Sequence, residues 1–177
     1  CPTQQMGMPP QQQMGQQGQY NQQDWPTSFP KPMIGIDRDG VILEWKNVIK
    51  RFEDVKYING SLEAIRKLRM KGHKMFMFSD QPNISRGLMN DNDVQNIMNN
   101  MMNQFGQSGI FSIDGFLYNQ SDDSRDPYAK PNVGMLARSK NEMGIDWTGG
   151  YYVGDTIEDI KMAIKFGVTP VLVRTGK

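Results

Sequence analysis

Two aspartates that follow an apolar run are the residues of this chain best placed to do chemistry. Residues 33–42 read MIGIDRDGVI, so Asp37 and Asp39 come at the carboxyl end of a predicted buried strand, and Gly40 begins a turn. In open parallel sheets, ligands bind beyond the carboxyl ends of the strands. Residues two apart on a strand share a face. One carboxylate could therefore attack an electrophile or bind a hard cation while the other transfers a proton.

Further polar signals follow in the chain, beside other predicted strands and helices. They are Ser79-Asp80-Gln81, Lys130-Pro131 and Gly154-Asp155-Thr156-Ile157-Glu158-Asp159. Together with Asp37 and Asp39 they suit phosphoryl transfer through an aspartyl-phosphate intermediate. In this interpretation Asp37 is the nucleophile, and Asp39 protonates the leaving oxygen and later deprotonates the attacking water. Lys130 and Ser79 would stabilise the phosphoryl oxygens.

This chemistry needs a divalent cation, because a carboxylate and a phosphate ester repel each other. Mg²⁺ binds a few carboxylates and keeps several waters. We therefore expect Mg²⁺ as the cofactor, held by residues drawn from Asp37, Asp39, Asp155 and Asp159. Asp159 lies one helical turn after Asp155 and is either a second ligand or a partner of the ligands. We expect substrate contacts from the segment after the second strand, at Asp80, Gln81, Asn83 and Arg86.

Short apolar runs that alternate with helical patterns predict an α/β domain. After the first strand, strands are predicted at 74–78, 115–118, 151–153 and 170–173. Four helices are predicted between them, with inward residues Leu62, Ile65 and Leu68; Val94, Ile97, Met98, Met101, Met102 and Phe105; Met135, Leu136 and Met143; and Ile157, Ile160, Ala163 and Ile164. This alternation predicts a parallel sheet covered by helices on both faces.

The motifs resemble those of the haloacid dehalogenase (HAD) superfamily of phosphatases, over nearly all of residues 33–177. Within it, the heptose bisphosphate and histidinol-phosphate phosphatase group is the most similar. The matching segments are IDRDGVI at 36–42, SDQPNISRG at 79–87, KPNVGML at 130–136, YVGDTIED at 152–159 and VLVRTG at 171–176. The resemblance implies a Rossmann-like core, Mg²⁺ dependence, Asp37 as nucleophile and Asp39 as general acid and base.

The chain departs from that group in one loop and at two residues. Residues 117–130 contain neither cysteine nor histidine, whereas the group often carries a zinc loop there, so we expect no zinc. Ala129 replaces an arginine that would contact a substrate phosphate, and Arg125 of the same loop could supply that charge. Asp80 replaces an asparagine and adds a negative charge beside the phosphate site. Whether the substrate is a sugar bisphosphate or another phosphate ester is left open.

The spacing of the motifs leaves no room for a separate cap domain, so the site is expected to be open. An open site suits a small phosphorylated substrate such as a sugar phosphate. The enzymatic alternative is a phosphatase of nucleic-acid ends, but a net charge of +1 offers little basic surface for a phosphate backbone. The alternative from another class is a non-catalytic binding or scaffold protein with the same fold.

The composition indicates one domain at residues 31–177, expected to be monomeric, behind a tail at 1–30. The tail is dominated by Gln, Gly, Met and Pro, which predicts disorder, and it could mediate association. The single cysteine, Cys1, excludes an internal disulfide framework, and the first residue favours a fragment. No apolar run approaches the roughly 20 residues that span a bilayer. We therefore expect no membrane partner and a cytoplasmic location.

Overall fold

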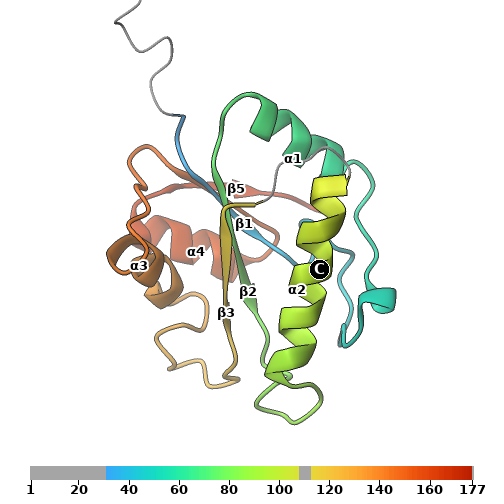
Figure 1. Ribbon diagram of the computed structural model, residues 1–177. Coiled ribbons are helices and arrows are strands. Elements are labelled where there is room, and N and C mark those ends of the chain that lie inside the picture. The colour runs from blue at the N-terminus through green and yellow to red at the C-terminus, as the bar shows by residue number, and fades with distance from the viewer. Residues whose placement is uncertain (1–30, 108–112, 177) are drawn as a thin grey trace, which may run out of the picture.

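The computed structural model describes residues 31–107 and 113–176, which form a five-stranded parallel sheet with helices on both faces (Figure 1). The strand order is β3-β2-β1-β4-β5. The strands span Ile34–Asp37 (β1), Met75–Asp80 (β2), Gly115–Asn119 (β3), Tyr151–Gly154 (β4) and Thr169–Leu172 (β5). The helices span Ser61–Met70 (α1), Asp91–Gln107 (α2), Gly134–Asn141 (α3) and Ile157–Phe166 (α4), with a short 3₁₀ helix at Phe52–Asp54. The predicted α/β class is confirmed.

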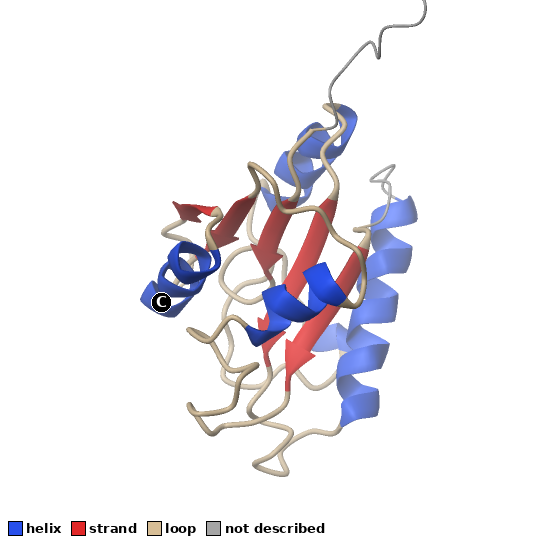
Figure 2. Cartoon of the chain, turned by 90° about the vertical axis from the view of Figure 1, so that its left-hand side faces the viewer, coloured by secondary structure: helices blue, strands red, loops and turns tan. Residues whose placement is uncertain are grey.

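The helices form two pairs, one on each face of the sheet. Figures 1 and 2 show α1 and α2 on one side and α3 and α4 on the other. Met75 and Met77 of β2 belong to the core beneath α1 and α2, whereas Phe76 and Phe78 belong to the core beneath α3 and α4. Successive strand residues point to opposite faces, so an unbroken apolar run is what a strand covered on both faces requires.

β1 lies at the centre of the sheet, and all four of its residues are buried. It pairs with β2 on one side, where Asp37 is in register with Phe78, and with β4 on the other. The strands are parallel, so their carboxyl ends meet at one edge of the sheet. This edge brings Asp37 together with Ser79 from β2 and Asp155, which follows β4.

The chain between β1 and α1 forms a short flap, residues 41–57, in place of a cap domain. The Gly40 N–H donates to the Leu43 carbonyl at 2.7 Å, and Leu43 makes isolated β-bridges to Asp39 and Tyr57. Leu43 is fully buried in the core beneath α1 and α2. The flap is therefore anchored to the domain near its first residues, and its two ends meet at Leu43 and Tyr57.

The inward face of α4 agrees with the prediction only in part. Ala163 is buried as predicted, but Ile157 and Ile164 are 58% and 63% exposed. The other buried residues of the helix are Asp159 and Met162. The isoleucine spacing indicated the wrong face because a buried ion pair between Asp159 and Lys130 accompanies the rotation of the helix. A prediction based on the spacing of apolar side chains cannot identify an inward face that carries a charged residue such as Asp159.

α3 is shorter than predicted at its carboxyl end. It buries Met135 and Leu136 as predicted, but it ends at Asn141. Met143 lies in the following turn and is 48% exposed, so the prediction that it faces the core was wrong. The turn reverses at Gly144, whose φ of +68° suits glycine and ends a helix readily.

Some predictions concern residues outside the described part of the chain. The tail at 1–30 is one of these, so its disorder, its role and the domain boundary at residue 31 stay predictions. Within residues 31–107 and 113–176, no helix has the length and apolar character needed to cross a membrane.

Candidate active site

Asp37 ends the central strand with its carboxylate buried. Its Oδ1 accepts a hydrogen bond from the Arg38 N–H at 2.8 Å and lies 2.9 Å from the Lys130 Nζ. Burial raises the pKa of Asp37 well above its usual range; Lys130 opposes that shift, and the nearby Asp159 and Asp39 add to it. The ionised form of Asp37 is therefore disfavoured mainly by burial, and Lys130 is the neighbouring charge that stabilises it most.

Lys130 is the cation that the buried carboxylates share. It precedes α3, and its Nζ lies 2.9 Å from Asp37 and 2.8 Å from Asp159. The ammonium also lies 5.8 Å from the centre of the Tyr152 ring. Burial alone would lower the pKa of Lys130, but Asp37, Tyr152 and Asp159 outweigh it and raise that pKa well above its usual value. Lys130 is thus a fixed positive charge beside Asp37.

Asp159 holds this lysine from behind. Its Oδ1 lies 2.8 Å from Lys130 Nζ, and its Oδ2 accepts from the Thr156 hydroxyl at 2.7 Å. The Asp159 N–H donates to Thr156 Oγ1 at 3.2 Å and the Thr156 N–H donates to Asp159 Oδ2 at 3.2 Å, and these two bonds form a capping box at the start of α4. Burial would raise the pKa of Asp159, but Lys130 and Thr156 outweigh it and lower that pKa. The Asp159 carboxylate therefore both fixes the start of α4 and positions the Lys130 ammonium.

Three carboxylates could hold a metal ion together. Asp37, Asp155 and Asp159 each offer an oxygen, and these oxygens lie within 4.8 Å of one another. A donor set made only of carboxylate oxygens suits a hard divalent cation such as Mg²⁺. Asp39 does not belong to this group of side chains, so the metal role given to it stays a prediction. The residues present fit the cofactor that the motifs predict.

The carboxylate of Asp39 is clamped by a buried arginine. Arg38 Nε donates to Asp39 Oδ1 at 3.1 Å, and Arg38 Nη2 donates to Oδ2 at 2.8 Å. Oδ2 also accepts from Gln81 Nε2 at 2.9 Å and from the Ser79 hydroxyl at 3.4 Å. A two-point contact from a planar guanidinium fixes the orientation of a carboxylate. Asp39 is therefore held in place without being a member of the metal group.

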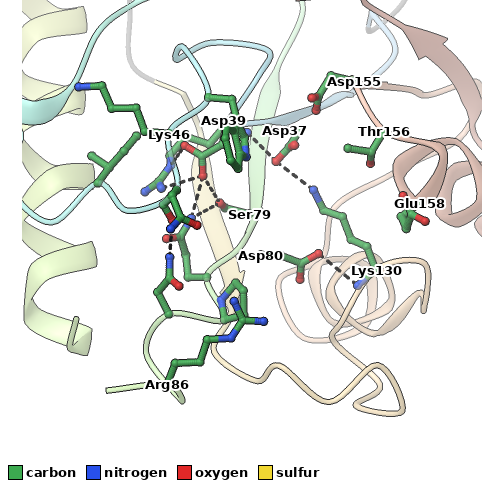
Figure 3. A pocket seen from close by; sticks show the side chains of 17 residues that line it. Asp37, Asp39, Lys46, Ser79, Asp80, Arg86, Lys130, Asp155, Thr156 and Glu158 are labelled. Carbon is green, nitrogen blue, oxygen red and sulfur yellow. Dashed lines mark hydrogen bonds and ion pairs between the residues drawn. The ribbon is translucent and has the colours of Figure 1, made fainter. Parts of the chain in front are cut away.

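These groups meet in one pocket of about 280 Å³ (Figure 3). In Figure 3, Lys130 points towards Asp37, with Asp155 beside them and Ser79 and Asp39 on the other wall. The predicted site residues that line the pocket are Asp37, Asp39, Ser79, Asp80, Gln81, Asn83, Arg86, Lys130 and Asp155. Asp159 is the one predicted site residue outside the lining, because it is buried behind Lys130.

Comparison with known proteins assigns the family. A family model described as HAD-hydrolase-like matches residues 127–177. The D-glycero-beta-D-manno-heptose-1,7-bisphosphate 7-phosphatase of Photorhabdus laumondii is 31% identical over 156 residues, which cover 82% of each chain. The enzyme of the same name from Escherichia coli K12 is 30% identical over 159 residues, covering 82% of this chain and 81% of its own. The chain belongs to the HAD-like hydrolase family.

Solved structures of HAD-like phosphatases share its fold. A D,D-heptose 1,7-bisphosphate phosphatase from B. bronchiseptica, complexed with magnesium and phosphate, superposes with a TM-score of 0.75 at 26% identity over 82% of each chain. The corresponding protein from Burkholderia thailandensis has a TM-score of 0.59 at 24% identity. The predicted family, fold and enzyme class, a HAD-type phosphatase, are confirmed.

Asp80 and Ala129, the two residues at which the motifs predict a departure from the group, lie beside Lys130. Asp80 Oδ2 accepts from the Lys130 N–H at 3.3 Å, and burial raises the pKa of Asp80 although Lys130 opposes the shift. Ala129 is buried next to it. Arg125 does not replace the charge that Ala129 lacks: its side chain is 89% exposed, pairs with Asp123 at 2.8 Å and is absent from the pocket lining. That part of the prediction was wrong, because the loop directs Arg125 outwards.

Two of the predicted substrate contacts are held by other parts of the protein. Asn83 Nδ2 donates to the Asn47 carbonyl at 2.7 Å, so it joins the loop after β2 to the flap. Arg86 Nε lies 3.3 Å from Asp122 in an exposed ion pair, which contributes little to stability. Both side chains still line the pocket, and their contact with substrate stays a prediction.

Several residues that line the pocket were not predicted from the sequence, among them Arg38, Trp45 and Thr156. Arg38 was quoted within its motif but given no role, and it proves to clamp Asp39. Trp45 of the flap lines the pocket, and no sequence signal marked it. Thr156 caps α4 through Asp159, and here a signal existed, because Thr-x-x-Asp before an apolar run approximates a capping box.

Gly40→Ala should damage both stability and the metal group. Gly40 has a φ of +86°, and a Cβ there would lie 2.3 Å from Asp155 Oδ2. Gly60→Ala is the matched control, because Gly60 has a φ of +81° and nothing within 4 Å of its Cβ position. We expect roughly 1–2 kcal/mol of lost unfolding free energy for Gly60→Ala from the left-handed backbone alone.

Gly40→Ala should cost about 1–3 kcal/mol more than its control, because it also displaces Asp155. Urea denaturation of the two variants measures that difference. Mg²⁺ should protect parent and Gly60→Ala against urea and protect Gly40→Ala much less. Equal stabilities and equal protection in the two variants would contradict the placement of Asp155 against Gly40.

Proposed function

We propose that the protein is a Mg²⁺-dependent phosphomonoester hydrolase that acts through a phosphorylated Asp37, on a small sugar phosphate. The observation that carries the proposal is the position of Asp37. Its carboxylate lies at the end of the central strand, 2.9 Å from a buried lysine and within a group of three carboxylates, at the floor of an open pocket. These are the parts needed for attack on a phosphate ester by a carboxylate.

In the first step Asp37 attacks the phosphorus atom. Its Oδ1 is engaged by Arg38 N–H and Lys130, so Oδ2 is the attacking oxygen. A bond forms between Oδ2 and phosphorus, the bond from phosphorus to the ester oxygen breaks, and that oxygen takes a proton from Asp39. Lys130 and Ser79 face the phosphoryl oxygens, where negative charge is stabilised most strongly in the transition state.

In the second step water attacks the phosphorus atom of phospho-Asp37. Asp39 now accepts the proton of the water, and the Asp37 oxygen leaves as a carboxylate, which releases inorganic phosphate and restores the enzyme. Arg38 and Gln81 hold Asp39 throughout, so that the same carboxylate serves both steps. A base fixed within reach of its proton contributes typically 10²–10⁴-fold, that is, ~2.7–5.4 kcal/mol.

Mg²⁺ would be held by Asp37 and Asp155, with Asp159 as a further carboxylate of the same group. When bound, the ion supplies positive charge that offsets the repulsion between the Asp37 carboxylate and the phosphate ester. The closeness of the three carboxylates, whose oxygens lie within 4.8 Å of one another, supports this assignment.

A small sugar phosphate is the substrate class that the site favours. The pocket is open and about 280 Å³ in volume, and its two partly solvated cations at the border are Lys46 and Arg86. The relatives named above are called heptose bisphosphate phosphatases. Similarity of about 30% supports a related substrate, and the changes at Asp80 and Ala129 argue that its anionic groups are bound differently.

Phosphate release from a panel of esters tests the proposal. The panel holds heptose 1,7-bisphosphate, histidinol phosphate, glucose 6-phosphate and a 3′-phosphorylated oligonucleotide, each with Mg²⁺ and with EDTA. We expect release from a sugar phosphate that depends on Mg²⁺. Release from the oligonucleotide alone would transfer the proposal to nucleic-acid ends. A folded protein inactive on all members would favour a binding role.

Asp80→Asn should strengthen phosphate binding. Asp80 lies at the strand-end edge beside Lys130, and its charge repels a phosphate dianion. At an intermediate effective dielectric constant, removing this repulsion should strengthen phosphate binding by about 1 kcal/mol. That energy corresponds to a roughly fivefold lower KM for the substrate and a roughly fivefold lower Ki for inorganic phosphate. Glu142→Gln, an exposed change directly after α3 and outside the pocket lining, is the control. Unchanged KM and Ki in Asp80→Asn would mean that Asp80 does not face the bound phosphate.

A further inference from the structure

The pocket border carries one large aromatic side chain. Trp45 of the flap is 44% exposed and lines the same pocket as Asp37 and Lys130. None of the other large apolar side chains that are exposed in the described part of the chain lines this pocket. A lone exposed apolar residue needs no explanation on an open surface, but one that lines the same pocket as Asp37 can contact a substrate bound there.

The segment that carries Trp45 is held on both sides. Lys46 Nζ donates to the Asp54 carbonyl within the flap. The Asn47 carbonyl accepts from Asn83 Nδ2 at 2.7 Å, and Asn83 is a buried residue of the loop after β2. Leu43, two residues before Trp45, is fully buried. A side chain held on a fixed segment loses little freedom on binding, so contact with it contributes more to affinity.

Apart from Ile49 and Pro82, the other residues that line the pocket are polar or charged, which restricts what can lie against this ring. Asp80, Gln81 and Glu158 offer hydrogen-bond acceptors, and Lys46 and Arg86 offer donors. A ligand that matches this border has a flat face with apolar C–H groups, hydroxyls around its edge and one phosphate at the pocket floor. A cyclic sugar phosphate has all three. A longer phosphate chain would meet Asp80 and Glu158 with like charge.

We infer that Trp45 selects the substrate by packing its indole ring against the ring of a cyclic sugar phosphate while the phosphate reaches Asp37. Asn83 is a positioning residue for Trp45 through the Asn47 carbonyl. The inference rests on the proposed function for the identity of the reaction, but it assigns the choice of leaving group to the flap. Packing against an aromatic ring is worth a factor of roughly ten in binding.

The kinetic test compares Trp45→Ala and Trp45→Phe with the parent on three substrates: glucose 6-phosphate, acetyl phosphate, which has no ring, and AMP. We expect Trp45→Ala to lower the ratio of kcat/KM for glucose 6-phosphate to that for acetyl phosphate by roughly tenfold, mostly through KM. Trp45→Phe should restore most of the ratio. Tyr128→Ala, an exposed aromatic outside this pocket, is the control and should leave the ratio unchanged.

A ratio in Trp45→Ala within about twofold of the parent would overturn the inference, because ring recognition is the effect being measured. A larger loss for AMP than for glucose 6-phosphate would also overturn it, since the ring would then be a nucleobase. Asn83→Ala should lower the same ratio, with the effect absent in a Trp45→Ala background. If the losses in this kcat/KM ratio from Asn83→Ala and Trp45→Ala were additive in the double variant, Asn83 would not act by positioning Trp45.

A binding measurement separates this inference from the proposed reaction. Trp45 fluorescence should be quenched by glucose 6-phosphate in the Asp37→Asn protein, in which turnover is blocked. The quenching should be absent in the Asp37→Asn, Trp45→Phe double variant and absent when inorganic phosphate alone is added to the Asp37→Asn protein. Quenching without activity in the parent would retain the Trp45 site and reject the reaction. Activity on glucose 6-phosphate without quenching would retain the reaction and reject the Trp45 site.

Discussion

The Asp37→Asn protein should fold normally and release phosphate at least about 10⁴-fold more slowly than the parent. An amide is a poor nucleophile, and it also withdraws one oxygen from the three-carboxylate group of Asp37, Asp155 and Asp159. Steady-state assays on the preferred sugar phosphate, with Mg²⁺ in excess, measure the loss. Asp123→Asn, an exposed change outside the pocket lining, is the matched control and should keep parental turnover.

The same substitution should leave the protein as stable as the parent, or more stable. The folded-state pKa of Asp37 is raised, so its ionised form costs stability at neutral pH, and that cost disappears as the pH falls below the ordinary carboxyl value. Thermal unfolding at neutral pH should therefore give Asp37→Asn an equal or higher Tm, with the difference shrinking in acid. A large loss of Tm at neutral pH would show that inactivity comes from misfolding.

Lys130→Met should impair catalysis and stability together. Methionine keeps the length of the side chain but leaves Asp37 and Asp159 buried without their cation. Removing one partner of a buried ion pair typically costs about 3–5 kcal/mol of unfolding free energy. Loss of a positive charge aimed at the phosphoryl group should lower kcat by roughly 10²–10³-fold. Urea denaturation and steady-state assays measure the two effects, and Lys161→Met, an exposed lysine of α4, is the control.

The instability of Lys130→Met should depend on pH in a defined direction. In the parent, the lowered pKa of Asp159 contributes stability above its ordinary value of 3.8, and that stability is lost as the pH falls. In the variant, buried carboxylates without a cation have raised pKa values, so they destabilise the fold at neutral pH and recover on protonation. The difference in unfolding free energy between the variant and the parent should therefore become smaller as the pH falls. A difference that is constant from neutral to acid pH would contradict the shared role of Lys130.

The strand-end aspartates could be predicted because two independent patterns agreed on them. Apolar runs placed Asp37 and Asp155 after strands, and parallel strands bring such residues to one edge of a sheet. The face of α4 could not be predicted in this way. Its isoleucines have helical spacing, yet the helix turns Asp159 inwards because that carboxylate binds both Lys130 and Thr156. Contacts between residues far apart in sequence decide such cases.

The side-chain contacts in the wall of the pocket could not be predicted from the sequence either. Nothing in the sequence near Asn83 indicates that its amide reaches the Asn47 carbonyl, or that Arg38 turns back onto Asp39. Arg125 looked like a substitute for the missing arginine by proximity in sequence, but its own neighbour Asp123 holds it outwards. Residue types could be predicted from motifs, whereas the direction of a loop side chain depends on its partners.

Detection of phospho-Asp37 tests the central claim most directly. Asp39→Asn protein is mixed with acetyl phosphate and Mg²⁺, quenched in acid and mapped by mass spectrometry. The acetate leaving group needs no proton, so the first step should proceed, while the second step lacks its base and the phosphoenzyme should accumulate. The account predicts one phosphoryl group on Asp37, and none in the Asp37→Asn, Asp39→Asn double variant. Phosphorylation of another residue, or turnover by the parent with no trapped phosphoryl group in Asp39→Asn, would contradict it.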